Sequence, residues 1–239
     1  MYNSFLIVLI ILAAFIPEQV INCQEYSQSI LDIDGNSYAT VTLGSQIWMA
    51  ENLRTTKYND GTPIPLITDN KIWQQYDKPG YCWYNNDESN KNKYGALYNW
   101  YAVNTKKLCP LGWHVPDTTD IWITLYGFLS ENNFGFDGDK QKIAKSMSSQ
   151  KGWTQDSMAG NVGNDQQSNN KSGFNMLPAG VRSYTGEFGY AGDYTHWWSS
   201  SERDTYLSIG WQIMCYYNKL APMWKSKRVG ASIRCVKNK

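Results

Sequence analysis

Apolar and polar residues alternate over short stretches near the start of the chain. Between residues 30 and 49 this two-residue period predicts β-strands. Asp34-Gly35 and Gly44-Ser45 are pairs that favour tight turns, so we predict a meander of two or three strands here. The alternating apolar positions are Leu31, Ile33, Tyr38, Thr40 or Val41, Ile47 and Met49.

Helical spacing follows in the middle of the chain. After a short predicted strand at 81–84, residues 94–104 carry a narrow apolar stripe that predicts a helix. A second, clearer helix begins at Asp117 or Thr118, either of which can cap its first turn. Residues 141–149 are expected to add a third, short helical turn. The apolar residues of the second helix recur at core spacing, at Ile121, Trp122, Leu125, Phe128 and Leu129.

Loops and further strands complete the pattern. Residues 59–70 and 152–172 are rich in turn-forming residues and predict irregular loops. Because strands flank a helical middle, we predict one α+β domain, residues 30–237, with an antiparallel sheet rather than parallel βαβ units. Strands near residues 40 and 234 can pair and bring its two ends together. The later strand signals lie at 174–177, 197–200, 206–215 and 231–236.

The first residues have the pattern of an export signal. Residues 5–16 form an unbroken apolar run, shorter than the roughly 20 residues of a bilayer span but suited to the core of a signal peptide. We therefore expect residues 1–23 to be a signal peptide and residues 24–29 a short tether. The protein is expected to be exported, extracellular or associated with the outer membrane and cell surface.

Cys23 is a lipidation candidate, because it lies where a bacterial lipoprotein presents its acylated cysteine. Asn22, just before it, departs from the small residue that is usual there, and plain cleavage nearby is the alternative. Membrane contact is expected only through such an N-terminal anchor.

Composition narrows the class of partner. The chain has 239 residues and a formal net charge of +1, with 18% charged residues. Nucleic-acid binding needs a basic surface that displaces phosphate counterions, so this partner is not expected. Aromatic residues reach 15%, with eleven Trp, and exposed rings bind sugars or proteins at low entropy cost. The alternative is that Trp and Tyr fix long loops against the core.

Four cysteines follow the predicted leader, and an even number in an exported chain favours disulfides over free thiols. Sequence alone leaves their three pairings open. No two of them form a CxxC pair and the two His are far apart, so a zinc site is not expected. The four disulfide candidates are Cys82, Cys109, Cys215 and Cys235.

Eight segments of the chain together resemble one family, the Fibrobacter succinogenes major paralogous domain of exported bacterial proteins. The resemblance covers residues 30–237 and implies a C-type lectin-like fold related to the formylglycine-generating enzymes. In such a fold antiparallel sheets accompany two main helices and long loops. The segments are DIDGN at 32–36, WMAENL at 48–53, YCWYNND at 81–87, YGALYNW at 94–100, CPLGWHVP at 109–116, LPAGVR at 177–182, WWSS at 197–200 and IRCV at 233–236.

The family brings no established biochemical activity. The resemblance suggests a disulfide between Cys109 and Cys235 and leaves Cys215 without an assigned partner. Formylglycine-generating enzymes use two cysteines close together near the C-terminus, whereas Cys215 and Cys235 are twenty residues apart. We therefore predict that the protein is not an enzyme. A related oxidase stays as an alternative function.

No cofactor is expected, although residues 85–90 carry oxygen ligands at alternate positions. The EF-hand template also needs Gly at its sixth position and Glu at its twelfth, and these are Asn90 and Ala96 here. A looser, structural calcium site is the alternative to a solvated turn. The sugar-binding triplets of calcium-dependent C-type lectins are absent from the sequence, so calcium-dependent glycan binding in that mode is disfavoured.

The groups able to do acid–base chemistry have structural explanations. His114 and His196 are surrounded by aromatic and apolar residues and are expected to be structural, while Asp117 and Asp120 are expected to cap the second helix. Four further charged residues are expected to be buried partners that fix the fold. They are Glu51, Arg54, Arg182 and Arg234.

The segment 202–228 is the predicted recognition surface, for an unknown glycan or surface protein. The loop 184–194 is expected to lie beside it. Alternation in 206–215 would turn Leu207, Ile209, Trp211 and Ile213 inward, and Tyr206, Ser208, Gln212 and Tyr216 outward. We therefore predict a surface module for binding or display, with a structural or assembly protein as a further alternative. The ligand-binding candidates are Tyr206, Trp211, Tyr216, Tyr217, Trp224 and Arg228.

Overall fold

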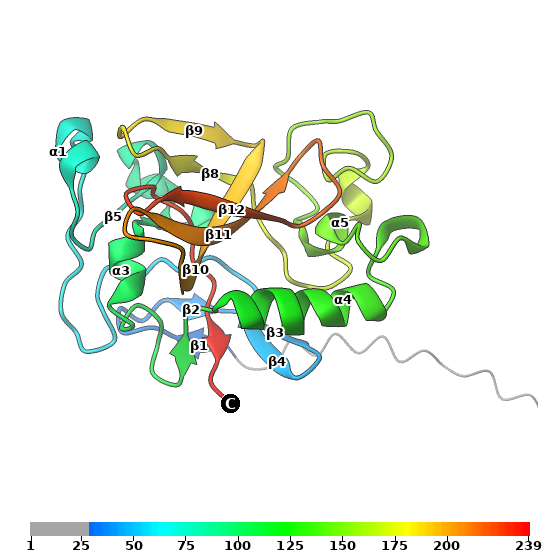
Figure 1. The fold of residues 1–239 in the computed structure, drawn as a ribbon, viewed down its shortest axis with the longest axis horizontal. Coiled ribbons are helices and arrows are strands. Elements are labelled where there is room, and N and C mark those ends of the chain that lie inside the picture. Colours follow the sequence, from blue (N-terminus) through cyan, green and yellow to red (C-terminus); the bar gives the residue numbers. More distant parts are fainter. Residues whose placement is uncertain (1–28) are drawn as a thin grey trace, which may run out of the picture.

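A five-stranded sheet crosses the molecule (Figure 1). The computed structural model describes residues 29–239, so the predicted signal peptide, Cys23 and the tether up to residue 28 lie outside the described residues. Within this described part, no helix is long and apolar enough to cross a membrane. In order across the sheet, the strands are β12 (Ala221–Ser226), β11 (Leu207–Met214), β10 (Tyr194–Glu202), β8 (Ala179–Arg182) and β9 (Phe188–Ala191).

A second, four-stranded sheet joins the two ends of the domain. The hairpin of β3 (Thr40–Leu43) and β4 (Gln46–Met49) pairs through β4 with β13 (Val236–Lys237), which in turn pairs with β7 (Trp113–His114). Val236 lies opposite Trp48, so the predicted pairing of the terminal strands is confirmed. The remaining strands form two small antiparallel ribbons, β1 (Ile30–Leu31) with β2 (Ser37–Tyr38) and β5 (Tyr81–Cys82) with β6 (Leu97–Tyr98).

The main helix lies between the two sheets (Figure 1). A wide, π-helical stretch, η3 (Thr119–Tyr126), continues without a break into α4 (Gly127–Glu131), as the sequence predicts. Ile121, Leu125 and Leu129 are fully buried on one stripe of this helix, whereas Trp122 is partly exposed. The short helical segments are α1 (Asn70–Gln75), α2 (Lys91–Tyr94), α3 (Trp100–Asn104), α5 (Ala144–Met147), η1 (Tyr84–Asn86), η2 (Glu88–Asn90), η4 (Phe136–Gly138) and η5 (Gln166–Ser168).

The predicted helix at 94–104 is shorter than expected. Gly95 ends α2 with a φ of +76°, a left-handed conformation that favours glycine, and residues 97–98 then form β6. Helix α3 begins only after Asn99, whose side chain accepts a hydrogen bond from the backbone N–H of Ala102. The apolar stripe therefore reflects burial from several directions rather than one continuous helix.

Besides β6, which interrupts the predicted helix, and β7, three further strands were not predicted, and two predicted strands are reduced. β8, β9 and β12 lie in segments rich in Gly or Pro, whose local preference disfavours strands. The stretch 174–177 makes only an isolated bridge at Met176, and only the end of 231–236 forms a strand, β13. With mostly antiparallel sheets and few helices, the architecture is nevertheless α+β, as predicted.

Neighbouring residues of β10 contribute to two separate cores. Successive side chains of a strand point to opposite faces. Trp197 therefore packs against the main helix, while Trp198 packs on the other side with Tyr98 and Trp100. The indole N–H of Trp198 donates to the backbone carbonyl of Tyr98 at 3.0 Å. Most of the tryptophans thus fix the interior rather than form an outer surface.

A disulfide joins Cys109 to Cys235, as the family resemblance suggests. The expectation that Cys82 and Cys215 also form disulfides is wrong, because both are free and buried in the described part of the chain. Burial raises the pKa of the Cys82 thiol to about 12 and also raises that of Cys215. Both thiols therefore stay protonated and act as small apolar groups.

The two buried arginines bind backbone carbonyls instead of carboxylates. Arg182 donates to the carbonyls of Gly186, Ile67 and Thr68. Arg234 donates to the carbonyls of Phe174 and Asn175, and neither arginine makes an ion pair with a described carboxylate. Glu51 and Arg54 do pair, 3.5 Å apart, but not as buried partners, because the side chain of Glu51 is 40% exposed. The arginines are needed because irregular loops leave carbonyls without strand partners.

Candidate functional site

The predicted recognition residues lie at opposite ends of β11. Tyr206 precedes the strand, whereas Tyr216 and Tyr217 follow it, and both groups are exposed. An eight-residue strand extends over roughly 27 Å. The structure therefore does not bring all the predicted residues into one surface.

Trp211 is not available to a ligand, because its side chain is only 2% exposed. It stacks against Trp122 of the main helix, with ring centroids 5.4 Å apart. The prediction that Ser208 faces solvent is also wrong, since this residue is fully buried. The sequence pattern assumes one solvated face of β11, but packing covers much of both faces of this inner strand.

Trp224 and Arg228 lie toward the same end of the sheet as Tyr206. Trp224 on β12 is opposite Ile209 and more than half exposed. The guanidinium of Arg203 covers its ring at 4.1 Å. This group therefore consists of single rings that are separated by charged side chains.

Three tyrosines gather at the other end of β11, and we call Tyr190, Tyr194 and Tyr216 the tyrosine cluster. The rings of Tyr190 and Tyr194 stack with centroids 4.7 Å apart, and Tyr216 meets Tyr194 edge-on at 5.8 Å. The hydroxyls of Tyr194 and Tyr216 share a hydrogen bond, which raises the pKa of Tyr194 to about 12. The loop 184–194 was predicted to lie beside the segment 202–228, and its last residues, Tyr190 and Tyr194, do lie next to Tyr216.

A tight turn builds this cluster. The backbone N–H of Asp193 donates to the carbonyl of Tyr190, and Gly192 adopts a φ of +93° within the turn. Tyr190 itself has a φ of +66°, which is uncommon for a residue with a side chain. About half of the surface of Tyr190 and of Tyr216 stays exposed. The fold thus holds an aromatic group at the surface.

His196 lies beneath the tyrosine cluster. Its ring stacks on Tyr194 at 5.9 Å, and it faces Gln212 across the β10–β11 pair. Burial, with a smaller effect of Lys225, lowers the pKa of His196 to about 3. The ring is therefore neutral at physiological pH and supports the cluster as a packed side chain.

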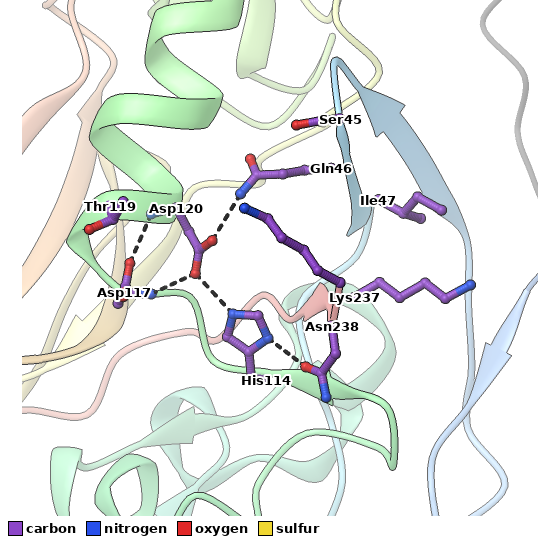
Figure 2. A pocket seen from close by; sticks show the side chains of 10 residues that line it. Ser45, Gln46, Ile47, His114, Asp117, Thr119, Asp120, Lys237 and Asn238 are labelled. Carbon is purple, nitrogen blue, oxygen red and sulfur yellow. Dashed lines mark hydrogen bonds and ion pairs between the residues drawn. The ribbon is translucent and has the colours of Figure 1, made fainter.

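A polar cleft of about 470 Å³ lies beside the C-terminal strand (Figure 2). The start of the main helix, the β3–β4 turn and the last residues of the chain form its walls. His114 is at the centre, with its Nε2 2.9 Å from Asp120 Oδ2 and its Nδ1 2.7 Å from Asn238 Oδ1. Gln46 also donates to Asp120, at 3.1 Å.

Asp117 and Asp120 cap the helix reciprocally, as predicted. The carboxylate of Asp117 accepts from the backbone N–H of Asp120, and that of Asp120 accepts from the N–H of Asp117. Both ring nitrogens of His114 face oxygen atoms, an arrangement that suits the doubly protonated imidazolium. These hydrogen bonds tie Asn238, near the end of the chain, to the start of the main helix.

The stabilisation by His114 should depend on pH. The hydrogen bond to Asp120 is the main cause that raises the pKa of His114 above its usual 6.5. The contribution is therefore fully present below about pH 6.5 and is lost as the pH rises through the folded-state pKa. Urea unfolding should show His114→Gln less stable than the parent by about 1 kcal/mol or less at pH 5.5, with a smaller difference at pH 8.5. A difference that stays constant over this range would contradict the assignment.

The segment considered for calcium forms two short helical turns. Asp87 accepts a hydrogen bond from the backbone N–H of Ser89 and caps η2. Among residues 29–239, no group of three or more His, Cys, Asp or Glu side chains is placed to hold a metal ion.

Comparison with known proteins gives one match. The model of the Fibrobacter succinogenes major domain matches residues 41–237. The chain belongs to this family. Comparisons with curated proteins and with solved structures gave no significant match. In this Fibrobacter succinogenes major domain, the distinctive segments form the framework, because they supply Arg182, Arg234 and the disulfide.

The tyrosine cluster lies between the distinctive segments of the Fibrobacter succinogenes major domain. The sequence indicated this loop as a neighbour of the recognition segment but did not single out Tyr190 and Tyr194. The turn residues between these two tyrosines were the available signal, because a tight turn brings flanking side chains together. The cleft at Asn238 had no such signal, since its walls come from three distant parts of the sequence.

Proposed function

We propose that this domain is a non-catalytic recognition module, exported to the bacterial surface, that binds a glycan through the tyrosine cluster. Export rests on the apolar run at 5–16, and Cys23 is the proposed site of a lipid anchor. We also propose a C-type lectin-like architecture. The paired terminal strands, the helix between two sheets and the long loops support it.

The observation that carries the proposal is the exposure of a preassembled aromatic group. Tyr190, Tyr194 and Tyr216 come from two strands and the turn after a third, yet their rings are in mutual contact. Aromatic faces pack against the C–H faces of sugars, and tyrosine hydroxyls can donate to or accept from sugar hydroxyls. Because the rings already hold one another, little conformational entropy remains to be lost on binding.

The size of the cluster favours a glycan over a protein. A stable protein interface buries about 800 Å² on each partner, which three neighbouring tyrosines do not supply. Gln212 lies on the same sheet face, because it pairs with His196, and Lys225 is close enough to affect the pKa of His196. Their polar groups can bind the outer hydroxyls of a sugar that packs on the rings.

The double variant Tyr190→Ala/Tyr216→Ala should lose glycan capture by at least about tenfold on a glycan array. Its Tm should change little, because both side chains are about half exposed. Tyr206→Ala is the matched control, since Tyr206 is exposed at the far end of β11. Undiminished capture by the double variant, or equal loss in Tyr206→Ala, would reject the tyrosine cluster as the binding surface.

A further inference from the structure

The ammonium group of Lys145 is buried and bound by the loop 152–172, which lies beside α5 (Figure 1). Lys145, on α5, is only 4% exposed. Its Nζ donates to the backbone carbonyls of Asn164 and Asp165 and, at 2.8 Å, to Oδ1 of Asn169. An ammonium group has three N–H donors, so these three acceptors use all of them. Because a buried charge is costly unless it is hydrogen-bonded, the ammonium holds this loop in one arrangement.

The charge of Lys145 has no other described partner. Among the residues that the structure describes, no carboxylate makes an ion pair with Lys145. Burial lowers the pKa of its ammonium below the usual value. The oxygen atoms of the loop therefore supply the hydrogen bonds that keep this lysine charged inside the protein.

The same loop contacts the chain on both sides of the tyrosine cluster. The backbone N–H of Thr154 donates to the carbonyl of Gly192 at 2.8 Å, within the turn that joins two of the tyrosines. The backbone N–H of Gly163 donates to the carbonyl of Cys215 at 2.7 Å, and the third tyrosine, Tyr216, is the next residue. The loop thus bridges the two parts of the chain that meet in the cluster.

Tyr216 lies beyond the paired part of the sheet. The last register pair of β10 and β11 is Tyr194 with Met214. One further hydrogen bond joins the N–H of Cys215 to the carbonyl of Asp193. A peptide group is planar, so the hydrogen bond that the carbonyl of Cys215 accepts from the loop also fixes the direction of the backbone N–H of Tyr216.

A short path joins the ammonium to this peptide group. The carbonyl of Asn164 binds the ammonium of Lys145, and the preceding residue, Gly163, donates to Cys215. A Cβ at Gly163 would come within 2.2 Å of the carbonyl oxygen of Thr154, so the two segments of the loop are in close contact there. A displacement of Asn164 therefore also displaces the donor that Cys215 needs.

We propose that Lys145 is a positioning residue for glycan recognition, which holds Tyr216 against Tyr194 through the loop 152–172. The inference rests on the proposed function of the tyrosine cluster, whereas the arrangement of the rings can be measured without a ligand. Without the ammonium, the loop carbonyls lose their donor and the ring of Tyr216 is ordered only when the glycan binds, which costs affinity.

Lys145→Met tests the effect on the rings, because methionine fills much of the space but has no N–H donor. In the parent protein, NMR should show nuclear Overhauser effects between the rings of Tyr194 and Tyr216, whose centroids are 5.8 Å apart. Lys145→Met should lose these effects and keep those between Tyr190 and Tyr194, which a tight turn joins. Effects between Tyr194 and Tyr216 that persist in a folded Lys145→Met protein would overturn the proposal.

Lys227→Met is the matched control, because it removes a similarly buried ammonium from another part of the fold. Lys227 is 5% exposed and donates to Glu202 and to the carbonyl of Thr205. Both variants should lower the Tm. At a temperature where both are folded, only Lys145→Met should weaken glycan capture, by about fivefold to tenfold. Equal losses of capture would show a general effect of destabilisation and would contradict a positioning role.

Lys145→Gln keeps the inference testable if Lys145→Met does not fold. Its side-chain amide retains N–H donors but is shorter and uncharged, so it cannot reach all three acceptors. The ring contacts of Tyr216 should weaken in this variant, and contacts as strong as those of the parent would reject the role of Lys145. The ring contacts decide this role whether or not a glycan is captured, so its failure is distinguishable from failure of the recognition proposal.

Discussion

Arg234→Met is expected to lower the free energy of unfolding by about 3–5 kcal/mol. The guanidinium is fully buried and donates to Asn52 Oδ1 at 3.0 Å and to the backbone carbonyl of Asn175 at 2.8 Å. It also donates to the carbonyl of Phe174 and lies 4.8 Å from the centroid of that ring. Methionine restores part of the packing but leaves several buried acceptors without a donor.

The charge of Arg234 makes this position unusual. Burial lowers its pKa to about 9, so it remains protonated at neutral pH without an adjacent carboxylate. The cost of burying the charge is offset by the carbonyl groups around it. Arg234→Lys should therefore rescue little, because a single ammonium group cannot reach acceptors on opposite sides.

Urea denaturation measures both variants, with Arg203→Met as the control. Arg203 is exposed and its ion pair with Asp204 is long, at 3.9 Å, so its loss should cost less than about 1 kcal/mol. If Arg234→Met and Arg203→Met destabilise the domain equally, the buried hydrogen bonds of Arg234 contribute little net stability.

Local patterns predicted the parts of the fold that local interactions determine. The main helix has a cap, a regular apolar stripe and a sufficient length, and the structure contains it at the expected place. The apolar stripe at 94–104 led to the wrong prediction of one helix. Residues that are buried from several sides can show the same spacing of apolar positions as one face of a helix. Only the position of Gly95 indicates that the segment is interrupted.

The alternation in β11 was correct as a strand signal and wrong as a guide to exposure. Ser208 is polar but fully buried, and Trp211 cannot serve as a ligand contact, because β10, β12 and the main helix surround the strand. The opposite error occurs at the end of β1, where Leu31 is exposed and Asp32, just after the strand, is buried. In both cases partners distant in sequence decide which side is buried.

The surfaces of interest could not be read from one segment. The tyrosine cluster joins a turn between two strands to the end of a third, and the cleft of His114 joins residues near 46, 117 and 238. The family resemblance identifies the framework segments that bring these parts together. The proposed recognition surface thus depends on tyrosines that the framework positions but does not include.

The double variant Cys109→Ala/Cys235→Ala is expected to destabilise the domain by up to about 5 kcal/mol. The disulfide closes a loop with a sequence separation of 126 residues, and its loss frees the unfolded chain from that constraint. It also fixes the segment that carries Arg234 and β13, so this effect and that of Arg234→Met should not be additive. Urea denaturation of Cys109→Ala/Cys235→Ala, of Arg234→Met and of the variant that combines them measures the interaction energy between the two changes.

Cys215→Ala is the matched control for the disulfide, because it removes a buried free thiol without breaking a cross-link. A reducing agent should lower the stability of the parent protein and of Cys215→Ala, but not that of Cys109→Ala/Cys235→Ala. Glycan capture should persist in the disulfide variant below its Tm, since the tyrosine cluster lies on other elements. A parent protein that unfolds at the same urea concentration with and without the reductant would show that the cross-link contributes no stability.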